Sequence, residues 1–168
     1  MKTFKVIEHK FLEQEVLESI IEIKSVRWAY SKAEHLAWIN ENISENDYHV
    51  IMFDDDQIVG YLNLVRGEVQ INKKKLSFLG VGNVCTKKSG FGYGKDILEF
   101  TNEIISSTDK VGILFCKDHL LNFYRKYGWQ LIEKMKVRLL NDNQLYINTM
   151  VFNFPSSVEE LIYLGKIF

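Results

Sequence analysis

The sequence predicts a mixed α/β fold (α+β) in which helices pack on one mixed β-sheet. Two observations support this. Segments typical of antiparallel strands come first, and the order strand, helix, strand, helix, strand follows them. The middle strand-helix-strand unit requires a right-handed crossover and two neighbouring parallel strands. With 168 residues, 46% of them hydrophobic, and no linker or repeat, we expect a single domain over residues 1–168.

The N-terminal part predicts one strand, two helices and a hairpin. Residues 4–7 form the first strand, and apolar residues recur at helical spacing over residues 13–26. Ser31 and Glu34 have the spacing of a capping box, which predicts a second helix over residues 31–39. Residues 48–53 and 58–65 are expected to pair as a hairpin around the turn at residues 54–56.

The C-terminal part predicts the rest of the sheet. Gly67 and residues 72–74 mark turns, and residues 76–85 form a long central strand. A helix over residues 93–106, a buried strand over 111–116 and a short helix over 120–127, ended by Gly128, come next. Residues 129–134 and 145–154 are expected to close the sheet as an antiparallel pair.

Composition excludes several classes of function. The net charge of −1 gives no reason to expect a nucleic-acid or membrane partner, and no apolar run is long enough for a membrane span. The N-terminus has no long apolar region, so we expect no signal peptide and a cytoplasmic location. Cys85 and Cys116 are then reduced core thiols, and we expect no metal site because no His or Cys lies near them at ligand spacing.

The most informative segment is residues 84–98, VCTKKSGFGYGKDIL. It predicts a strand, a glycine loop and a helix N-terminus in that order, which is an arrangement that binds phosphate groups. The P-loop pattern fails because Asp96 follows Gly94-Lys95 where a hydroxyl is needed, and the dinucleotide-binding pattern fails because Lys95 stands at its third glycine.

What remains, Ser-Gly-x-Gly-x-Gly, resembles motif A of the GNAT superfamily of N-acetyltransferases, with the pattern Q/R-x-x-G-x-G/A. Ser89, Gly92 and Gly94 occupy its three defined positions. About 30 residues downstream, residues 121–129, LNFYRKYGW, resemble motif B, a tyrosine-bearing helix that closes with a Gly-Phe/Trp turn. The resemblance covers roughly residues 51–134, with the motifs in the family's order.

The resemblance implies a twisted mixed sheet in which two central parallel strands, ending near Cys85 and Cys116, splay apart and bind acetyl-CoA. Backbone groups of Asn83, Val84 and Cys85 would bind the pantetheine arm. Backbone N–H groups of the loop would hold the pyrophosphate: Ser89, Gly90, Phe91, Gly92, Tyr93, Gly94 and Lys95. The side chains of Lys87, Lys88 and Lys95 either add charge near the 3′-phosphate or are ordinary solvated lysines.

The resemblance also implies catalytic roles. Tyr124 would be the general acid that protonates the leaving thiolate; the alternative is a structural hydroxyl that only touches coenzyme A. Many relatives carry a glutamate on the central strand, but residues 77–85, SFLGVGNVC, contain no carboxylate or histidine. We therefore assign no base among the candidates Glu34, His35, Asp47, His49 and His119. The sequence also departs from the family at Ser89, where Arg or Gln is usual.

The acceptor site of this fold is built from the first two helices and the hairpins, which here implies Trp28, Tyr30 and His35, with Trp38 and Tyr61 as further candidates. The C-terminal Phe168 is added because the ending Gly-x-x-aromatic is similar to that of aminoglycoside 2′-N-acetyltransferases. The leading hypothesis is an acetyl-CoA-dependent N-acetyltransferase for a small-molecule amine, aminoglycoside-like in one version, acting as a monomer or homodimer. The alternatives are a peptide or protein N-acetyltransferase and an inactive CoA-binding module.

Overall fold

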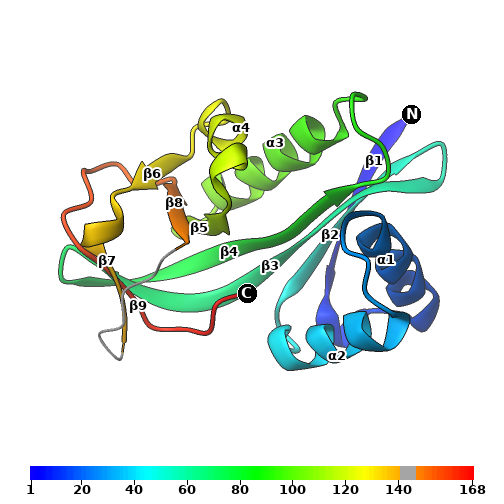
Figure 1. The fold of residues 1–168 in the computed structure, drawn as a ribbon, viewed down its shortest axis with the longest axis horizontal. Helices are drawn as coiled ribbons and strands as arrows, with labels where there is room; N and C mark the ends of the chain where they lie inside the picture. The colour runs from blue at the N-terminus through cyan, green and yellow to red at the C-terminus, as the bar shows by residue number, and fades with distance from the viewer. Residues whose placement is uncertain (141–146) are drawn as a thin grey trace. The chain divides into compact units, whose positions relative to one another are not determined.

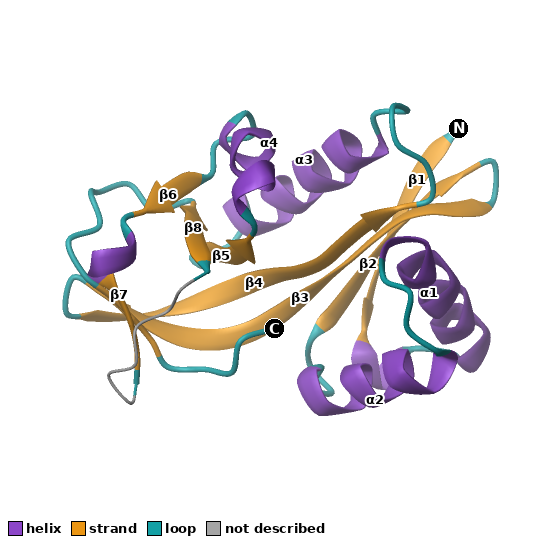
Figure 2. Cartoon of the chain, in the orientation of Figure 1, coloured by secondary structure: helices purple, strands orange, loops and turns teal. Residues whose placement is uncertain are grey.

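The computed structural model describes residues 1–140 and 147–168, and the chain divides into two compact units (Figure 1). Unit 1 contains residues 1–65 and 82–101, and unit 2 contains residues 66–81 and 102–168. Figure 2 shows the two long strands, β3 (Gln57–Ile71) and β4 (Lys74–Thr86), and the helix α3 (Tyr93–Ser106). By the bounds above, each of these three elements contributes residues to both units. Each unit is described separately below.

The sheet of unit 1 is antiparallel. β1 (Lys2–Glu8) pairs with β2 (Tyr48–Asp54), and β2 pairs with the first part of β3. The β2–β3 hairpin closes through Asp55 and Asp56, both with positive φ, as a tight two-residue turn requires. The last residues of β4 lie beside β3 in the strand order. This part of the sheet therefore leads directly into the glycine loop.

Helices pack on both faces of this sheet. On one face, α1 (Gln14–Arg27) contributes Ile20 and Ile23, which pack against Ile51 and Tyr61. On the other face, Phe4 stacks on Phe100 of α3, with ring centroids 4.3 Å apart. The second helix, α2 (Lys32–Asn42), begins with the predicted capping box. A short 3-10 helix, η1 (His9–Phe11), precedes α1.

Unit 2 contains the parallel pair. The first part of β4 pairs with β5 (Val111–Cys116), from Phe78 opposite Val111 to Val81 opposite Leu114. β5 pairs antiparallel with β8 (Asn148–Phe152), and β8 with β6 (Gln130–Ile132). The last residues of β3 pair with β9 (Leu161–Tyr163), which pairs parallel with β7 (Val137–Leu139). Two 3-10 helices, η2 (Asp118–Leu120) and η3 (Lys134–Lys136), and α4 (Leu121–Arg125) complete the unit.

The mixed sheet with flanking helices is therefore confirmed, and the helix over 93–106 and the strand over 111–116 have the predicted bounds. The turn predicted at Gly67 was wrong, because β3 continues through it to Ile71. The ring of Phe78 lies so close that a Cβ on Gly67 would meet it at 2.6 Å. This glycine therefore serves close packing rather than a turn.

Other differences concern element ends. The helix predicted over 120–127 is shorter as α4, and β7 and β9 were not predicted. Strands of three residues carry too few positions for an alternation pattern. The predicted strand over 145–154 corresponds to β8 in its described part, whereas residues 145 and 146 lie outside the described residues.

Candidate cofactor and acceptor sites

The glycine loop of unit 1 is exposed and shaped by left-handed glycines. Gly90 and Gly92 have φ of +83° and +77°, and a Cβ on either would meet no heavy atom within 4 Å. Backbone conformation, and not crowding, is thus what requires glycine at these two positions. The surface above the loop is open, and a ligand can approach the backbone closely there.

The loop leads directly into α3. The first hydrogen bond of this helix runs from the Asp96 N–H to the Gly92 carbonyl, 3.0 Å. The N–H groups of residues 93–95 therefore have no partner within the helix, as at any helix N-terminus. Together with the positive end of the helix dipole, they form a donor set suited to a phosphate group.

A hollow of about 290 Å³ adjoins the loop within unit 1 and is lined by Asp54, Asp55, Gln57, Val59, Lys87, Lys88 and Tyr93. Its two charged carboxylates both have partners. The Tyr93 hydroxyl donates to Asp54 Oδ2 at 3.0 Å, and the N-terminal ammonium pairs with Asp55. Lys88 and Lys87 supply positive charge beside the loop, with the Lys88 Nζ 5.5 Å from the ring centroid of Phe91.

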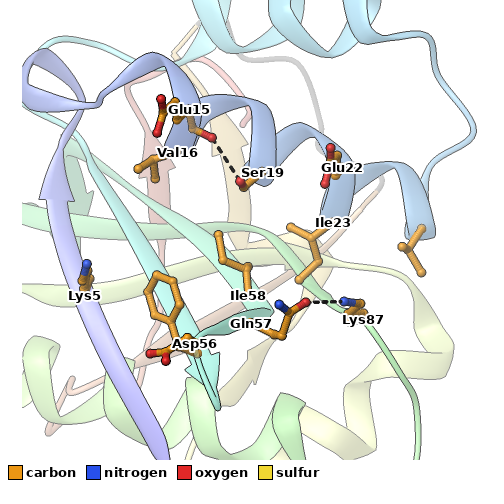
Figure 3. Close-up of a pocket in the computed structure, with 12 residues that line it drawn as sticks. Lys5, Glu15, Val16, Ser19, Glu22, Ile23, Asp56, Gln57, Ile58 and Lys87 are labelled. Atoms are coloured by element: carbon orange, nitrogen blue, oxygen red, sulfur yellow. Dashed lines mark hydrogen bonds between the residues drawn. The ribbon is translucent and has the colours of Figure 1, made fainter.

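Lys87 also borders a larger cavity of about 510 Å³, which lies between α1 and the strands of unit 1 (Figure 3). Glu15, Ser19 and Glu22 of α1 face Lys5, Asp56 and Gln57 across it (Figure 3). The Lys87 Nζ donates to Gln57 Oε1 at 3.3 Å. The wall of this cavity is therefore mixed in charge.

The last residues of β4 depart from regular strand geometry at Asn83, whose φ is +54°. A left-handed non-glycine residue in a strand is strained and typical of functional sites. The Asn83 Nδ2 donates to Asn63 Oδ1 at 2.7 Å, which holds the strained residue in place. Burial raises the pKa of the neighbouring Cys85 thiol to about 12, so this cysteine is a core residue and not a nucleophile.

Three aromatic residues predicted for the acceptor site do lie together. The His35 Nε2 lies 3.2 Å from the Trp28 carbonyl oxygen, and the Tyr30 and His35 rings meet edge to face with centroids 5.7 Å apart. Lys24 of α1 lies beside this group; its Nζ is 4.3 Å from the ring centroid of Trp38. Burial lowers the pKa of Lys24 to about 8.

A chain of hydrogen bonds runs through the same part of unit 1. The Tyr61 hydroxyl lies 2.9 Å from His49 Nδ1, and His49 Nε2 lies 2.9 Å from His9 Nδ1. Burial, reinforced by the charges of His9 and Lys24, lowers the pKa of His49 to about 3. His49 is therefore neutral with one N–H, and it links the buried Tyr61 hydroxyl, whose pKa burial raises, to the half-buried His9.

In unit 2, Tyr124 lies on α4 and is buried. Its ring meets those of Phe123 and Trp129, with centroids 5.1 and 6.4 Å away. The Trp129 indole N–H donates to Asn102 Oδ1 at 3.0 Å. The turn ends in Gly128, at φ +84°. The pattern FYRKYGW therefore fixes the tyrosine through aromatic packing and a glycine turn.

Phe168 also lies in unit 2. Its ring packs against Phe78, Phe115 and Tyr163, and a Cβ on Gly80 would clash with it. The C-terminal aromatic residue thus fills a space that a glycine leaves open. Its contribution to an acceptor site stays a prediction.

The comparisons with known proteins bear on both motifs. The family model described as an acetyltransferase (GNAT) domain matches residues 9–132, which include the glycine loop and α4. The chain belongs to this family.

Solved structures agree on the fold of this GNAT domain. An acyl-CoA N-acyltransferase from Pseudomonas aeruginosa is 16% identical, covers 89% of this chain and 99% of its own, and has a TM-score of 0.64. PaiA N-acetyltransferase from Thermoplasma acidophilum, solved with coenzyme A, is 18% identical, with coverage of 90% and 99% and a TM-score of 0.54. An aminoglycoside 6′-N-acetyltransferase, also solved with coenzyme A, is 11% identical, with coverage of 88% and 95% and a TM-score of 0.61.

Within the GNAT domain, the base candidates are engaged in different ways. The Glu34 carboxylate completes the capping box, and Asp47 Oδ2 accepts from the Ser44 N–H. His35 and His49 belong to the groups described above, and His119 lies on η2 in unit 2. Glu34 and Asp47 therefore have structural hydrogen bonds to backbone N–H groups.

Sequence reasoning missed the importance of Lys24 and Asn63. Lys24 lies at helical spacing from the apolar residues of α1 that face the sheet. This spacing is the one sequence signal that its side chain would be buried. Nothing in the sequence marked Asn63, because a buried amide in a strand has no pattern of its own.

Across residues 1–140 and 147–168, no cluster suited to a metal ion and no helix long and apolar enough to span a membrane is found.

Proposed function

We propose that this protein is an acetyl-CoA-dependent N-acetyltransferase that acts on the primary amine of a small molecule, with residues 1–168 forming one acetyltransferase domain. The observation that carries the proposal is the GNAT family match over residues 9–132, which contains both the glycine loop and the tyrosine helix. The coenzyme A found in two solved structures of the same fold also supports it.

The backbone N–H groups of residues 89–95 bind the pyrophosphate of the cofactor. Support comes from the left-handed Gly90 and Gly92 and from the open N-terminus of α3. The pantetheine arm hydrogen-bonds to the backbone of Asn83, Val84 and Cys85. Ser89 lacks the long donor usual in the family, which weakens binding only in part because the loop acts through its backbone.

Bound acetyl-CoA supplies the acetyl group as a thioester. The neutral acceptor amine attacks the carbonyl carbon, so that a C–N bond forms, the C–S bond breaks and the amine loses a proton. In the proposal, Tyr124 donates the proton that the departing thiolate takes up, and the proton that the amine loses passes to water and restores the Tyr124 hydroxyl from solvent. The amide and the free thiol are the balanced products.

A thiol-release assay with acetyl-CoA and a panel of amines, including kanamycin and short peptides, tests the activity. We expect Tyr124→Phe to lower kcat roughly 100-fold or more while the affinity for acetyl-CoA, measured by calorimetry, changes little. The ring that Tyr124 packs with Trp129 is retained in this variant. An unchanged kcat would remove the acid role from Tyr124.

The second candidate is a CoA-binding module without activity. Ser89 and the absence of a carboxylate from β4 favour it. Binding of acetyl-CoA without turnover of any amine would support this candidate, whereas turnover of peptides alone would favour a peptide N-acetyltransferase. No binding of acetyl-CoA at all would overturn the main proposal.

A further inference from the structure

Lys24 is a buried cation within unit 1. Only 2% of the residue is exposed, and its Nζ lies on the face of the Trp38 ring. Its position on α1 is four residues after Ile20, so it shares the stripe that packs on the sheet. Its positive charge acts on three neighbouring groups. It contributes to the lowered pKa values of His35 and His49, and it partly offsets the rise that burial causes in the pKa of Cys85.

In the part of the chain that the structure describes, no ion pair or hydrogen bond joins Lys24 to another group. Its ammonium contacts the Trp38 ring and interacts electrostatically with the Cys85 thiol. A buried ammonium without a counter-charge is costly, and proteins seldom retain one without a use for it. The groups on which its charge acts are two histidines and a thiol, and the Glu34 carboxylate, which also acts on His35, accepts a hydrogen bond from the Ser31 N–H. Arg27 also acts on Cys85, and the two histidines carry no negative charge.

A second donor lacks a partner on the same side of the sheet. The Asn63 side chain is fully buried and accepts from Asn83, but its Nδ2 has no hydrogen-bond partner. Asn63 lies directly opposite His49 in the β2–β3 register, and Ile51 lies opposite Tyr61. Residues so paired share a face, and here it is the face that α1 covers.

We propose that Lys24 and Asn63 bind a carboxylate of the acceptor, so that the preferred substrates are amines that carry a carboxylate, such as amino acids. This inference rests on the proposed acetyltransferase function and narrows its substrate class. A carboxylate brings one negative charge and two acceptor oxygens, which match one ammonium and one amide N–H. A doubly charged phosphate would leave charge uncompensated in a site with one lysine.

The same charges disfavour a polycation. An aminoglycoside amine placed against Lys24 and Arg27 would meet like charge, and among residues 1–140 and 147–168 no carboxylate forms an ion pair with either side chain. The ring of Trp38 lies against the Lys24 ammonium, and an aromatic side chain of this kind suits an acceptor with an apolar body. Tryptophan and tryptamine are therefore a suitable probe pair, because they differ in the carboxylate alone.

The experiment compares kcat/KM for tryptophan, tryptamine and kanamycin in the full-length protein and in Lys24→Gln. We expect the wild type to prefer tryptophan over tryptamine by roughly tenfold or more, and Lys24→Gln to lose most of that preference. Asn63→Ala is expected to reduce the preference for tryptophan over tryptamine by a smaller factor than Lys24→Gln does. In Lys24→Gln, the rate with tryptamine and the affinity for acetyl-CoA report whether the protein is still folded. In Asn63→Ala, urea denaturation does so, because Asn63 holds Asn83 of the proposed pantetheine site.

Lys32→Gln is the matched control, since Lys32 is exposed and pairs with Glu18 on the surface. Lys32→Gln should keep the full preference for tryptophan over tryptamine. A wild type that prefers tryptamine or kanamycin, or a preference unchanged in Lys24→Gln, overturns the carboxylate site while leaving acetyltransferase activity intact. Binding of acetyl-CoA with no turnover of tryptophan also overturns it, whereas loss of acetyl-CoA binding in the wild type overturns the proposed function itself.

Discussion

The glycine loop and the polar cluster beneath α1 are both in unit 1, but they are built in opposite ways. The loop is exposed, has few side-chain contacts and depends on the backbone freedom of Gly90 and Gly92. The cluster of Lys24, His49 and Asn63 is buried and depends on side chains from one helix and two strands. Changes in the loop should therefore alter acetyl-CoA binding with little effect on stability, whereas changes in the cluster should also alter stability and its dependence on pH.

The largest expected effect is on stability and comes from Lys24. Its pKa of about 8 in the folded protein lies below the ordinary value of 10.5, so the folded state binds fewer protons than the unfolded state between these pH values. The burial of the charge costs about 3 kcal/mol at neutral pH, and the protein should become more stable as the pH rises from about 8 to 10.5.

Lys24→Met removes the buried charge and keeps the length of the side chain. We expect an increase of about 1 to 3 kcal/mol in the free energy of unfolding at pH 7, measured by urea denaturation. The difference in the free energy of unfolding between the wild type and Lys24→Met should shrink above pH 8, because the wild type gains stability there. Lys32→Met, on the surface, should change stability by less than about 0.5 kcal/mol. A Lys24→Met protein less stable than wild type would contradict the unpaired burial of this cation.

A smaller effect is expected on the acid side from His49. Its pKa of about 3 lies below the ordinary value of 6.5, so only the unfolded state gains this proton as the pH falls through this range. The stability that neutral His49 preserves is present above pH 6.5 and is lost toward pH 3. The loss is about 2 kcal/mol between pH 6.5 and 5.

In His49→Gln, the loss of unfolding free energy that His49 causes at acid pH should vanish, because an amide does not titrate. The glutamine side chain can still form the hydrogen bond to Tyr61. Urea denaturation at pH 7 and pH 5 measures the difference. The exposed ring of Tyr30 gives a neutral comparison: Tyr30→Phe should keep the wild-type slope. An equal loss of stability in wild type and His49→Gln would show that His49 is protonated in the folded protein.

The same contrast explains what could be predicted from the sequence. The loop was predictable because its function depends on glycines at fixed spacing before a helix, and α3 begins where the pattern placed it. The tyrosine of α4 was found for the same reason. Lys24, His49 and Asn63 come from three segments, and their proximity depends on the β2–β3 register and on which face α1 covers. No local pattern encodes either of these.

The smallest effect on stability is expected in the loop, where binding should change instead. Gly92→Val forces a β-branched residue to φ of +77°, so the loop will shift to relieve the strain. Because the loop is exposed, stability should fall by only about 1 kcal/mol, while the affinity for acetyl-CoA should fall roughly tenfold to 100-fold.

Lys73→Val makes the same type of change at φ of +66° in the turn between β3 and β4, away from the loop. Both variants should lose similar stability in urea denaturation, but calorimetry should show weaker acetyl-CoA binding in Gly92→Val alone. Equal affinities in the two variants would mean that the left-handed glycines shape a turn and not a cofactor site.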